Sequence, residues 1–251
     1  MSRIIWRDIE WFYINLSHRT DRLAHITQEF DRIGISAQRF DALRLEDYHG
    51  PKKDVAVMMA TPKTIGNWLS HLAVWKKVQD TDKVVGVLED DALLCDDFTA
   101  RLQYIEDNFD KPWDIFYLGA TYHVDHPVWH KHTLGRDFEQ TDVKYIHRVY
   151  GAFSNQGYLV NGQSVTKLLA LMEREKPTTR GSDTAMIKLQ PELQCYSFTP
   201  GMVFQIDSQS DIGIGVTRFS KFFDTLGAHV WCRRLEDFDY DSYNWHEGTR
   251  P

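Results

Sequence analysis

Three consecutive carboxylates, Glu89-Asp90-Asp91, give the strongest chemical signal in the sequence, and they directly follow the apolar run 84–88. An unalternating apolar run is typical of a buried strand in a parallel sheet, and open α/β sheets bind ligands at the carboxyl ends of their strands. Carboxylates are also preferred ligands of the hard divalent cations that neutralise a diphosphate. The triplet therefore fits a metal site at a strand end, although an acidic helix N-terminus, which the helix dipole favours, explains it equally well.

A second polar group lies on the helix that the sequence predicts from Pro62 onward, with Thr61 as its N-cap. Its members are spaced at i, i+4, i+7 and i+8: Lys63, Asn67, Ser70 and His71. Such a stripe opposite an apolar face is usually the solvated face of a helix. Trp68 and Trp75 flank it, however, which is unusual for a solvated face.

Two other patterns resemble metal sites only loosely. The first is a group of histidines with one aspartate: His123, Asp125, His126, His130 and His132. It fits no standard zinc spacing, and a polar loop is the better interpretation. The second, residues 236–241, alternates acids with aromatics but lacks the glycine and the spacing of a calcium-binding loop. A solvated tail or an oligomer contact is favoured there.

The elements that must position these residues alternate between short apolar runs and helical periodicity, which is the signature of an α/β fold with a mostly parallel central sheet flanked by helices. The expected strands cover residues 11–16, 37–40, 84–88, 113–118, 145–150, 156–160, 194–198 and 202–206. The expected helices run from an N-cap at Ser17 to Gly34, from 62 onward, after the strand at 84–88 to about 109, around 165–172 and over 182–189. Residues from 217 onward show no strand signal.

Length and composition exclude several classes of protein. The chain has 251 residues, enough for one α/β domain whose core needs no disulfide or metal. Its 29 Lys and Arg against 36 Asp and Glu give a net charge of −7, which argues against a nucleic-acid partner. No apolar run approaches the ~20 residues that span a bilayer, and residues 1–8 lack the apolar core of a signal peptide. Three scattered cysteines fit a reducing compartment, so we expect a cytoplasmic location, with peripheral membrane association left open.

The two polar segments together resemble a known family. Residues 65–75, Ile-Gly-Asn-Trp-Leu-Ser-His-Leu-Ala-Val-Trp, followed by 87–91, Val-Leu-Glu-Asp-Asp, are similar to glycosyltransferase family 25. Further segments resemble the family in the same order: 13–16 with Arg19, Asp21 and Arg22, then 39–42, 113–119, 157–160 with 167–169, 182–183 and 210–212. An ordered set that spans residues 10–212 is far more specific than any single motif.

The resemblance implies a GT-A fold, which is a Rossmann-like α/β domain, over residues 1–216, with residues 217–251 as a C-terminal extension packed on or beside it. It also implies a UDP-sugar donor, UDP-galactose by family habit, and a divalent cation such as Mn²⁺. Asp91 and Glu89 are then the metal ligands. The chemistry agrees, because transfer expels a nucleoside diphosphate and a cation stabilises that leaving charge.

The resemblance further implies which residues bind the nucleotide: Asn15, Arg19, Arg22, Asp41, Ser70, His71, Glu89 and Asp90. The first four lie at or just beyond the carboxyl ends of the first two expected strands, where an α/β sheet binds a nucleotide. Surface charge on a helix or turn explains Arg22 equally well.

Family members are classed as inverting, so one carboxylate must deprotonate the acceptor hydroxyl for in-line attack at the anomeric carbon. Asp183 is the expected base, because it follows a Gly-Ser turn and opens a short helix. A helix N-cap is the alternative role for it. Asp207 and Asp211 are the next candidates for the base.

Together these expectations indicate an enzyme that moves a sugar, expected to be galactose, from a UDP-sugar to a hydroxyl of a glycan, glycolipid or protein. A non-catalytic relative that binds glycans or nucleotide sugars is one alternative. Another metal-dependent nucleotide-processing enzyme, such as a nucleotidyltransferase, is the second, but it would be expected to carry a glycine-rich phosphate loop, and the sequence shows none. The sequence is compatible with an oligomer of this chain.

Overall fold

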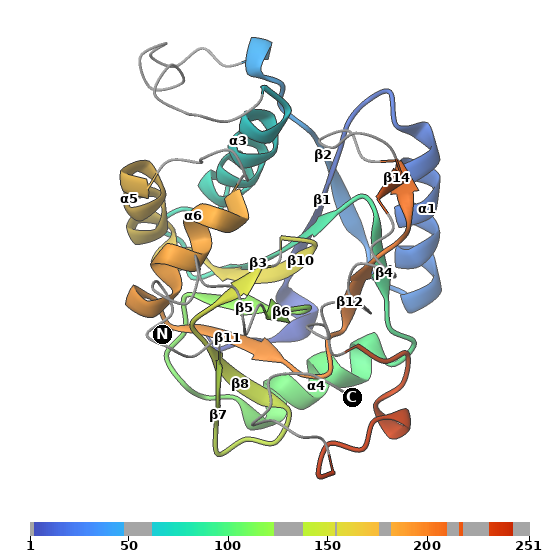
Figure 1. The fold of residues 1–251 in the computed structure, drawn as a ribbon, viewed down its shortest axis with the longest axis vertical. Helices are drawn as coiled ribbons and strands as arrows, with labels where there is room; N and C mark the ends of the chain where they lie inside the picture. Colours follow the sequence, from blue (N-terminus) through green and yellow to red (C-terminus); the bar gives the residue numbers. More distant parts are fainter. Residues whose placement is uncertain are drawn as a thin grey trace.

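An eight-stranded sheet forms the centre of the molecule (Figure 1). In sheet order its strands are β2 (Ala37–Asp41), β1 (Glu10–Asn15), β3 (Val84–Glu89), β10 (Gly157–Asn161), β5 (Ile115–Tyr117), β11 (Cys195–Phe198), β8 (Ile146–Val149) and β7 (Phe138–Gln140). All of them except β10 and β8 run in the same direction. The expected α/β class with a mostly parallel sheet is confirmed, and β2, β1 and β3 form a continuous parallel block at one edge.

The structure is a computed structural model and describes residues 3–47, 62–122, 138–153, 155–175, 182–209, 216–217 and 231–242. The histidine group at 123–132 lies outside these residues. No helix among them is long and apolar enough to cross a bilayer. The three cysteines carry free thiols, and the cytoplasmic location stays a prediction.

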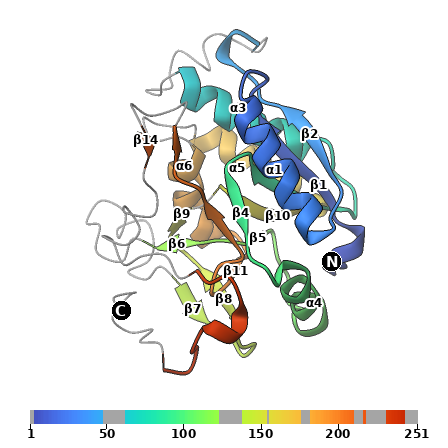
Figure 2. The same ribbon diagram turned by 90° about the vertical axis from the view of Figure 1, so that its right-hand side faces the viewer.

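Helices cover both faces of the sheet, and each face has its own apolar core. α1 (Thr20–Ile33) and α4 (Phe98–Asn108) pack on one face, while α3 (Pro62–Lys76), α5 (Val165–Glu175) and α6 (Ser182–Leu189) pack on the other. Figure 1 shows α3, α5 and α6 grouped on the side opposite α1, and Figure 2 shows α1 alongside β1 and β2. The fold is therefore three-layered, with the sheet between two layers of helices.

Shorter elements complete the described part of the chain. Three antiparallel strand pairs are β4 (Ala92–Leu94) with β12 (Val203–Gln205), β6 (Thr121–Tyr122) with β9 (Ala152–Phe153), and β13 (Ser208–Gln209) with β14 (Val216–Thr217). Single 3₁₀ turns lie at Trp6–Asp8, Leu45–Asp47, Gly162–Ser164, Gln190–Glu192 and Leu235–Asp237. Of these six short strands, only β12 was expected from the sequence.

The start of α1 differs from the prediction, whereas its end agrees. Its N-cap is Arg19 rather than Ser17, because the chain first makes a turn in which the Arg19 amide donates to the Leu16 carbonyl at 2.9 Å. Gly34 is the C-cap with a φ of 71°. Glycine adopts this left-handed conformation without a steric penalty, which explains why the helix stops there.

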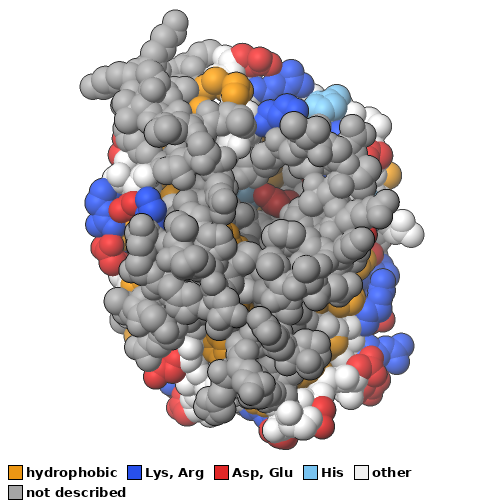
Figure 3. Space-filling model, in the orientation of Figure 1, with side chains coloured by type: hydrophobic (Ala, Val, Ile, Leu, Met, Phe, Trp, Pro, Cys, Tyr) orange, Lys and Arg blue, Asp and Glu red, His pale blue; other side chains and the backbone are white. Residues whose placement is uncertain are grey.

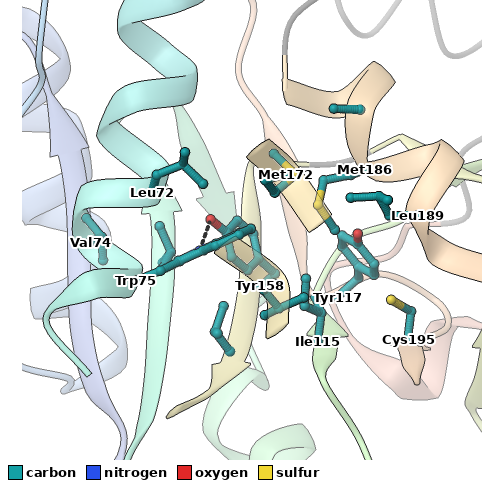
Figure 4. Close-up of a cluster of buried hydrophobic side chains, with 14 of the residues drawn as sticks. Leu72, Val74, Trp75, Ile115, Tyr117, Tyr158, Met172, Met186, Leu189 and Cys195 are labelled. Carbon is teal, nitrogen blue, oxygen red and sulfur yellow. Dashed lines mark hydrogen bonds between the residues drawn. The ribbon is translucent and has the colours of Figure 1, made fainter. Parts of the chain in front are cut away.

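Two buried tyrosines on neighbouring strands, Tyr158 on β10 and Tyr117 on β5, lie in the core under α3, α5 and α6 (Figure 4). They are opposite each other in the strand register, with ring centroids 6.3 Å apart. Trp75 Nε1 donates to the Tyr158 hydroxyl at 3.0 Å, and Gln190 Nε2 donates to the Tyr117 hydroxyl at 3.0 Å. Each buried hydroxyl thus has the polar partner that burial requires.

Residues 231–242 pack against α4 and β8. The buried Arg101 on α4 donates to the Cys232 carbonyl at 3.1 Å, and the Asp97 carboxylate accepts from the Leu235 amide at 2.7 Å. The Tyr240 hydroxyl lies 2.9 Å from Nε2 of His147 on β8. This segment of the expected C-terminal extension is therefore attached to the main body, and the division of the chain at residue 216 stays a prediction.

His147 is expected to make the fold sensitive to acid. Its imidazole is fully buried and stacks on Phe138 with 5.0 Å between ring centroids, and burial lowers the pKa of His147 to about 4. Because the pKa of an unfolded histidine is about 6.5, the unfolded chain binds a proton between pH 6.5 and 4 that the folded chain does not bind. Stability therefore falls as the pH falls through this window, by about 2 kcal/mol from this group between pH 7 and pH 5.

Urea unfolding at pH 7 and pH 5 measures this contribution. His147→Gln should lack that part of the acid-induced loss, because glutamine does not titrate. His18→Gln, at an exposed position, is the control for the loss of one histidine side chain. An unchanged pH dependence in His147→Gln would contradict the assignment.

Candidate active site

The acidic triplet lies at the carboxyl end of β3. Glu89 is the last residue of β3, and Asp90 and Asp91 form the turn into β4. The interpretation of the triplet as a helix N-terminus is wrong, because β4 intervenes and α4 begins only at Phe98. The helix expected to end at about residue 109 is confirmed as α4. β4 forms by pairing with β12, which is remote in the sequence. The local sequence pattern therefore does not predict β4.

Asp90 is held by side chains from β1 and α1. Asn15, the last residue of β1, donates through Nδ2 to Asp90 Oδ2 at 2.7 Å, and accepts through Oδ1 from Arg39 Nε at 3.1 Å. Arg22 Nη1 donates to Asp90 Oδ1 at 2.9 Å and lies 3.1 Å from Asp91 Oδ2. The Arg22 side chain is only 11% exposed, so its interpretation as surface charge is wrong. Both oxygens of Asp90 are engaged by protein donors.

Glu89 is contacted from the opposite side by α3. Asn67 Nδ2 donates to Glu89 Oε1 at 2.9 Å, and His71 Nε2 lies 3.5 Å from the same oxygen. Asn67 is half-buried, and His71 is buried together with Ser70. The interpretation of the α3 polar stripe as a solvated face is therefore wrong for these three residues, while Lys63 is exposed as expected.

Gln205, the last residue of β12, joins the two outer carboxylates of the triplet. Its Nε2 lies 3.1 Å from Glu89 Oε2 and 3.4 Å from Asp91 Oδ1. Sequence analysis missed Gln205, because β12 reaches the triplet only by pairing with β4, with Gln205 opposite Ala92. The sequence signal for Gln205 is its position near the end of the strand predicted at 202–206.

Burial and mutual repulsion set the charges of the triplet. Burial, followed by the charge of Glu89, raises the pKa of Asp91 to about 7, and burial also raises the pKa of Asp90. Burial opposes the ionisation of Glu89 as well, but the contacts from His71 and Asn67 outweigh it, so the pKa of Glu89 is lowered. A cation placed between Glu89 and Asp91 would favour the ionised form of Asp91.

The donor set fits a hard divalent cation. Glu89 Oε2 and Asp91 Oδ1 converge on one atom, Nε2 of Gln205, so two carboxylate oxygens face a shared point. Oxygen ligands of this kind suit Mg²⁺ or Mn²⁺. Among the described residues no group of three or more His, Cys, Asp or Glu side chains is arranged to bind a metal. Gln205 Nε2 lies at this point, so a cation that binds both carboxylates would displace it.

Ser70 lies behind the site rather than facing the triplet. Its hydroxyl donates to the Gly66 carbonyl at 2.7 Å and accepts from the Leu43 amide at 2.8 Å. Ser70 therefore ties the chain after β2 to α3. Its expected role in nucleotide binding stays a prediction.

Arg19 lies beyond the end of β1, and Asp41 is the last residue of β2, opposite Asn15 at the same edge of the sheet as the triplet. Arg19 pairs with Asp21 at 2.8 Å. Asp41 pairs with Arg39 at 2.9 Å, and its side chain is 79% exposed. The roles of both residues in nucleotide binding stay predictions.

Asp183 is the second residue of α6, which packs against α3. The side chain of Asp183 and the whole of Asp211 lie outside the described part of the structure. Asp207 is exposed, two residues beyond Gln205. The choice of the base among these aspartates stays a prediction.

Figure 3 shows acidic side chains, with a histidine beside them, near the centre of one face of the molecule. Concave sites with a few converging polar groups are the usual places where proteins bind small molecules. The converging carboxylates make this the candidate active site.

A family model described as glycosyltransferase family 25 (LPS biosynthesis protein) matches residues 8–184. The chain belongs to glycosyltransferase family 25. This match confirms the resemblance inferred from residues 65–75 and 87–91, and it covers the triplet, α3 and the start of α6.

Curated relatives of this family 25 chain include procollagen galactosyltransferases. Procollagen galactosyltransferase 1-A of Xenopus laevis is 26% identical over 92% of this chain and 40% of its own length. Human procollagen galactosyltransferase 2 is 29% identical over 44% of this chain and 20% of its own length. A glycosyltransferase 25 family member of Aedes aegypti is 28% identical over 66% of this chain and 28% of its own. The chain thus spans at most two fifths of these relatives.

A solved structure was also compared with this family 25 chain. A beta-1,4-galactosyltransferase 7 from Drosophila, in complex with manganese, UDP-Gal and xylobiose, aligns over 96% of this chain and 79% of its own. The TM-score is 0.36 and the identity 11%, a similarity too weak to support a conclusion about this chain.

Proposed function

We propose that this chain is an inverting, divalent-metal-dependent glycosyltransferase that moves galactose from UDP-galactose to a hydroxyl group of a glycan or protein. The observation that supports this most directly is the convergence of Glu89 Oε2 and Asp91 Oδ1 on one point at the carboxyl end of β3. Family membership supports sugar transfer, and relatives named procollagen galactosyltransferase support galactose as the sugar.

Glu89 and Asp91 would hold the divalent cation. When bound, Mn²⁺ or Mg²⁺ supplies positive charge that stabilises the departing nucleoside diphosphate. Asp90 would not be a ligand in this scheme, because Asn15 and Arg22 engage both of its oxygens. Its role is to fix the turn in which Asp91 lies.

The nucleotide would bind over the carboxyl ends of β1 and β2, which is the usual place in an open α/β sheet. Arg19, Arg22 and Asp41 lie at that edge. Arg22 is the side chain best placed to face a diphosphate, because it already lies between Asp90 and Asp91. His71 is 1% exposed, so its contribution would act through Glu89 rather than through the nucleotide.

The acceptor hydroxyl must lose its proton as it attacks the anomeric carbon with inversion, and we assign that step to Asp183. Support comes from the position of Asp183 in the first turn of α6, a helix that packs against α3, which contributes Asn67 and His71 to the site. The names of the relatives and of the family model suggest two acceptor classes, a protein hydroxyl and a lipopolysaccharide glycan.

We expect UDP to bind about 100-fold more weakly without a divalent cation than with one. The diphosphate would otherwise face the carboxylates of the triplet unscreened, at a cost of about 1–4 kcal/mol for a pair of unit charges 4 Å apart. Isothermal titration calorimetry with UDP, in Mn²⁺ and in EDTA, measures the difference. Equal affinities would contradict the metal bridge.

A panel of nucleotide sugars separates the proposal from its alternatives. Mn²⁺-dependent hydrolysis of UDP-galactose, with thermal stabilisation, is the expected result. A relative that only binds nucleotide sugars would show stabilisation without hydrolysis. A nucleotidyltransferase would release pyrophosphate from nucleoside triphosphates instead.

A further inference from the structure

A chain of buried side chains leads from the core under α3 to the acidic triplet. Trp75 Nε1 donates to the Tyr158 hydroxyl at 3.0 Å (Figure 4), and this hydroxyl lies 2.6 Å from His71 Nδ1. His71 Nε2 in turn lies 3.5 Å from Glu89 Oε1. Trp75, Tyr158 and His71 are 2%, 1% and 1% exposed. None of these three is accessible to a bound nucleotide, so any effect they have on the site passes through Glu89.

The chemistry of the donors determines where the protons lie. An indole N–H only donates, so the Tyr158 oxygen accepts from Trp75. If a neutral His71 carried its proton on Nδ1, its Nε2 lone pair would face the Glu89 carboxylate, which is repulsive. If Tyr158 donates to Nδ1 instead, Nε2 carries the proton and its N–H faces Glu89. Within the described part of the structure, His71 Nε2 forms no hydrogen bond to another residue, and the carboxylate of Glu89 is the acceptor that it faces.

We propose that Tyr158, held by Trp75, is a positioning residue: by donating to Nδ1 it holds the His71 ring so that the Nε2–H group faces and orients Glu89. With Oε1 occupied by Asn67 and His71, the other oxygen of Glu89 is directed toward the point it shares with Asp91. Partners that orient a ligating carboxylate typically change metal affinity by about 10–100-fold when they are removed. The link to metal binding rests on the proposed function, whereas the tautomer of His71 does not.

Tyr158→Phe tests the inference, because it removes only the hydroxyl. Nitrogen-15 NMR of the imidazole side chains reports the tautomer of His71, with the resonance assigned by its absence in His71→Gln. The wild-type chain should show the Nε2–H form with Nδ1 accepting a hydrogen bond, and Tyr158→Phe should keep the Nε2–H form, which Glu89 still favours, but lose the hydrogen-bond shift of the Nδ1 resonance. In calorimetry with UDP and Mn²⁺, Tyr158→Phe should lose about 10–100-fold in affinity, while UDP affinity in EDTA should not change.

Tyr117→Phe is the matched control. Tyr117 lies opposite Tyr158 in the strand register, is equally buried, and its hydroxyl also accepts one hydrogen bond, from Gln190. Its loss should cost comparable stability but leave the His71 resonances and UDP affinity in Mn²⁺ unchanged. His71→Gln, which keeps an N–H donor near the position of Nε2, should retain more of this affinity than His71→Phe, which has none.

The results of these experiments distinguish a failure of this inference from a failure of the proposed function. A wild-type His71 protonated on Nδ1 would overturn the inference whatever the chain binds. Equal loss of UDP affinity in Tyr117→Phe and Tyr158→Phe would also overturn it, because the effect would then follow from lowered stability. Absence of Mn²⁺-dependent UDP binding in the wild-type chain would overturn the proposed function and with it the link to metal, while the NMR result would still decide the tautomer.

Discussion

Asp91→Asn is expected to reduce sugar transfer by about 10³-fold, the upper range for removal of one group that stabilises charge in a transition state. The substitution keeps the shape of the side chain but removes one of the two carboxylates that face Gln205. The cation would lose a charged ligand, and the leaving diphosphate would lose the cation. Turnover of UDP-galactose and calorimetry with UDP in Mn²⁺ both measure the loss.

The fold should survive this change. Arg22 keeps its hydrogen bond to Asp90 when Asp91 is replaced. Burial and the charge of Glu89 already raise the pKa of Asp91 to about 7, so the fold by itself does not favour the ionised carboxylate. We therefore expect the melting temperature to stay the same or to rise. Asp82→Asn, at an exposed position just before the opposite end of β3, is the control and should retain activity. An unfolded or still active Asp91→Asn chain would make the triplet structural.

Asp183→Asn is expected to lower turnover by about 10²–10⁴-fold, which is the typical contribution of a general base. The amide keeps the size of the carboxylate but cannot take a proton from the acceptor hydroxyl. UDP-galactose affinity should hardly change, because the base faces the acceptor rather than the diphosphate. Turnover, UDP-galactose affinity and melting temperature, measured on this one variant, test the assignment.

Other roles for Asp183 give different results. As a helix N-cap it could be replaced by asparagine without loss, because asparagine caps as well as aspartate does. As a metal ligand it would lose Mn²⁺-dependent UDP binding together with turnover. Near-normal turnover in Asp183→Asn would move the search for the base to Asp207→Asn and Asp211→Asn.

Several features of this protein were determined by local sequence alone. The uniform apolar run at 84–88 forms β3, and the triplet follows at its carboxyl end as predicted. The helix expected over residues 182–189 has the same bounds in the structure, and Gly34 ends α1. These features depend on periodicity and on turn residues, which act over a few neighbouring positions. The local sequence is therefore sufficient to predict these elements.

The tertiary structure alone decided which side chains meet the triplet. The polar stripe of α3 has the spacing of a solvated face, and only the packing of α3 over the end of β3 turns Asn67 and His71 toward Glu89. Gln205 reaches the carboxylates only because β12 pairs with β4, and Tyr158 meets His71 only because β10 runs antiparallel beside β3. The physical reason is the same in each case: these contacts join segments that are remote in sequence, and their pairing depends on how the whole sheet assembles rather than on any local pattern.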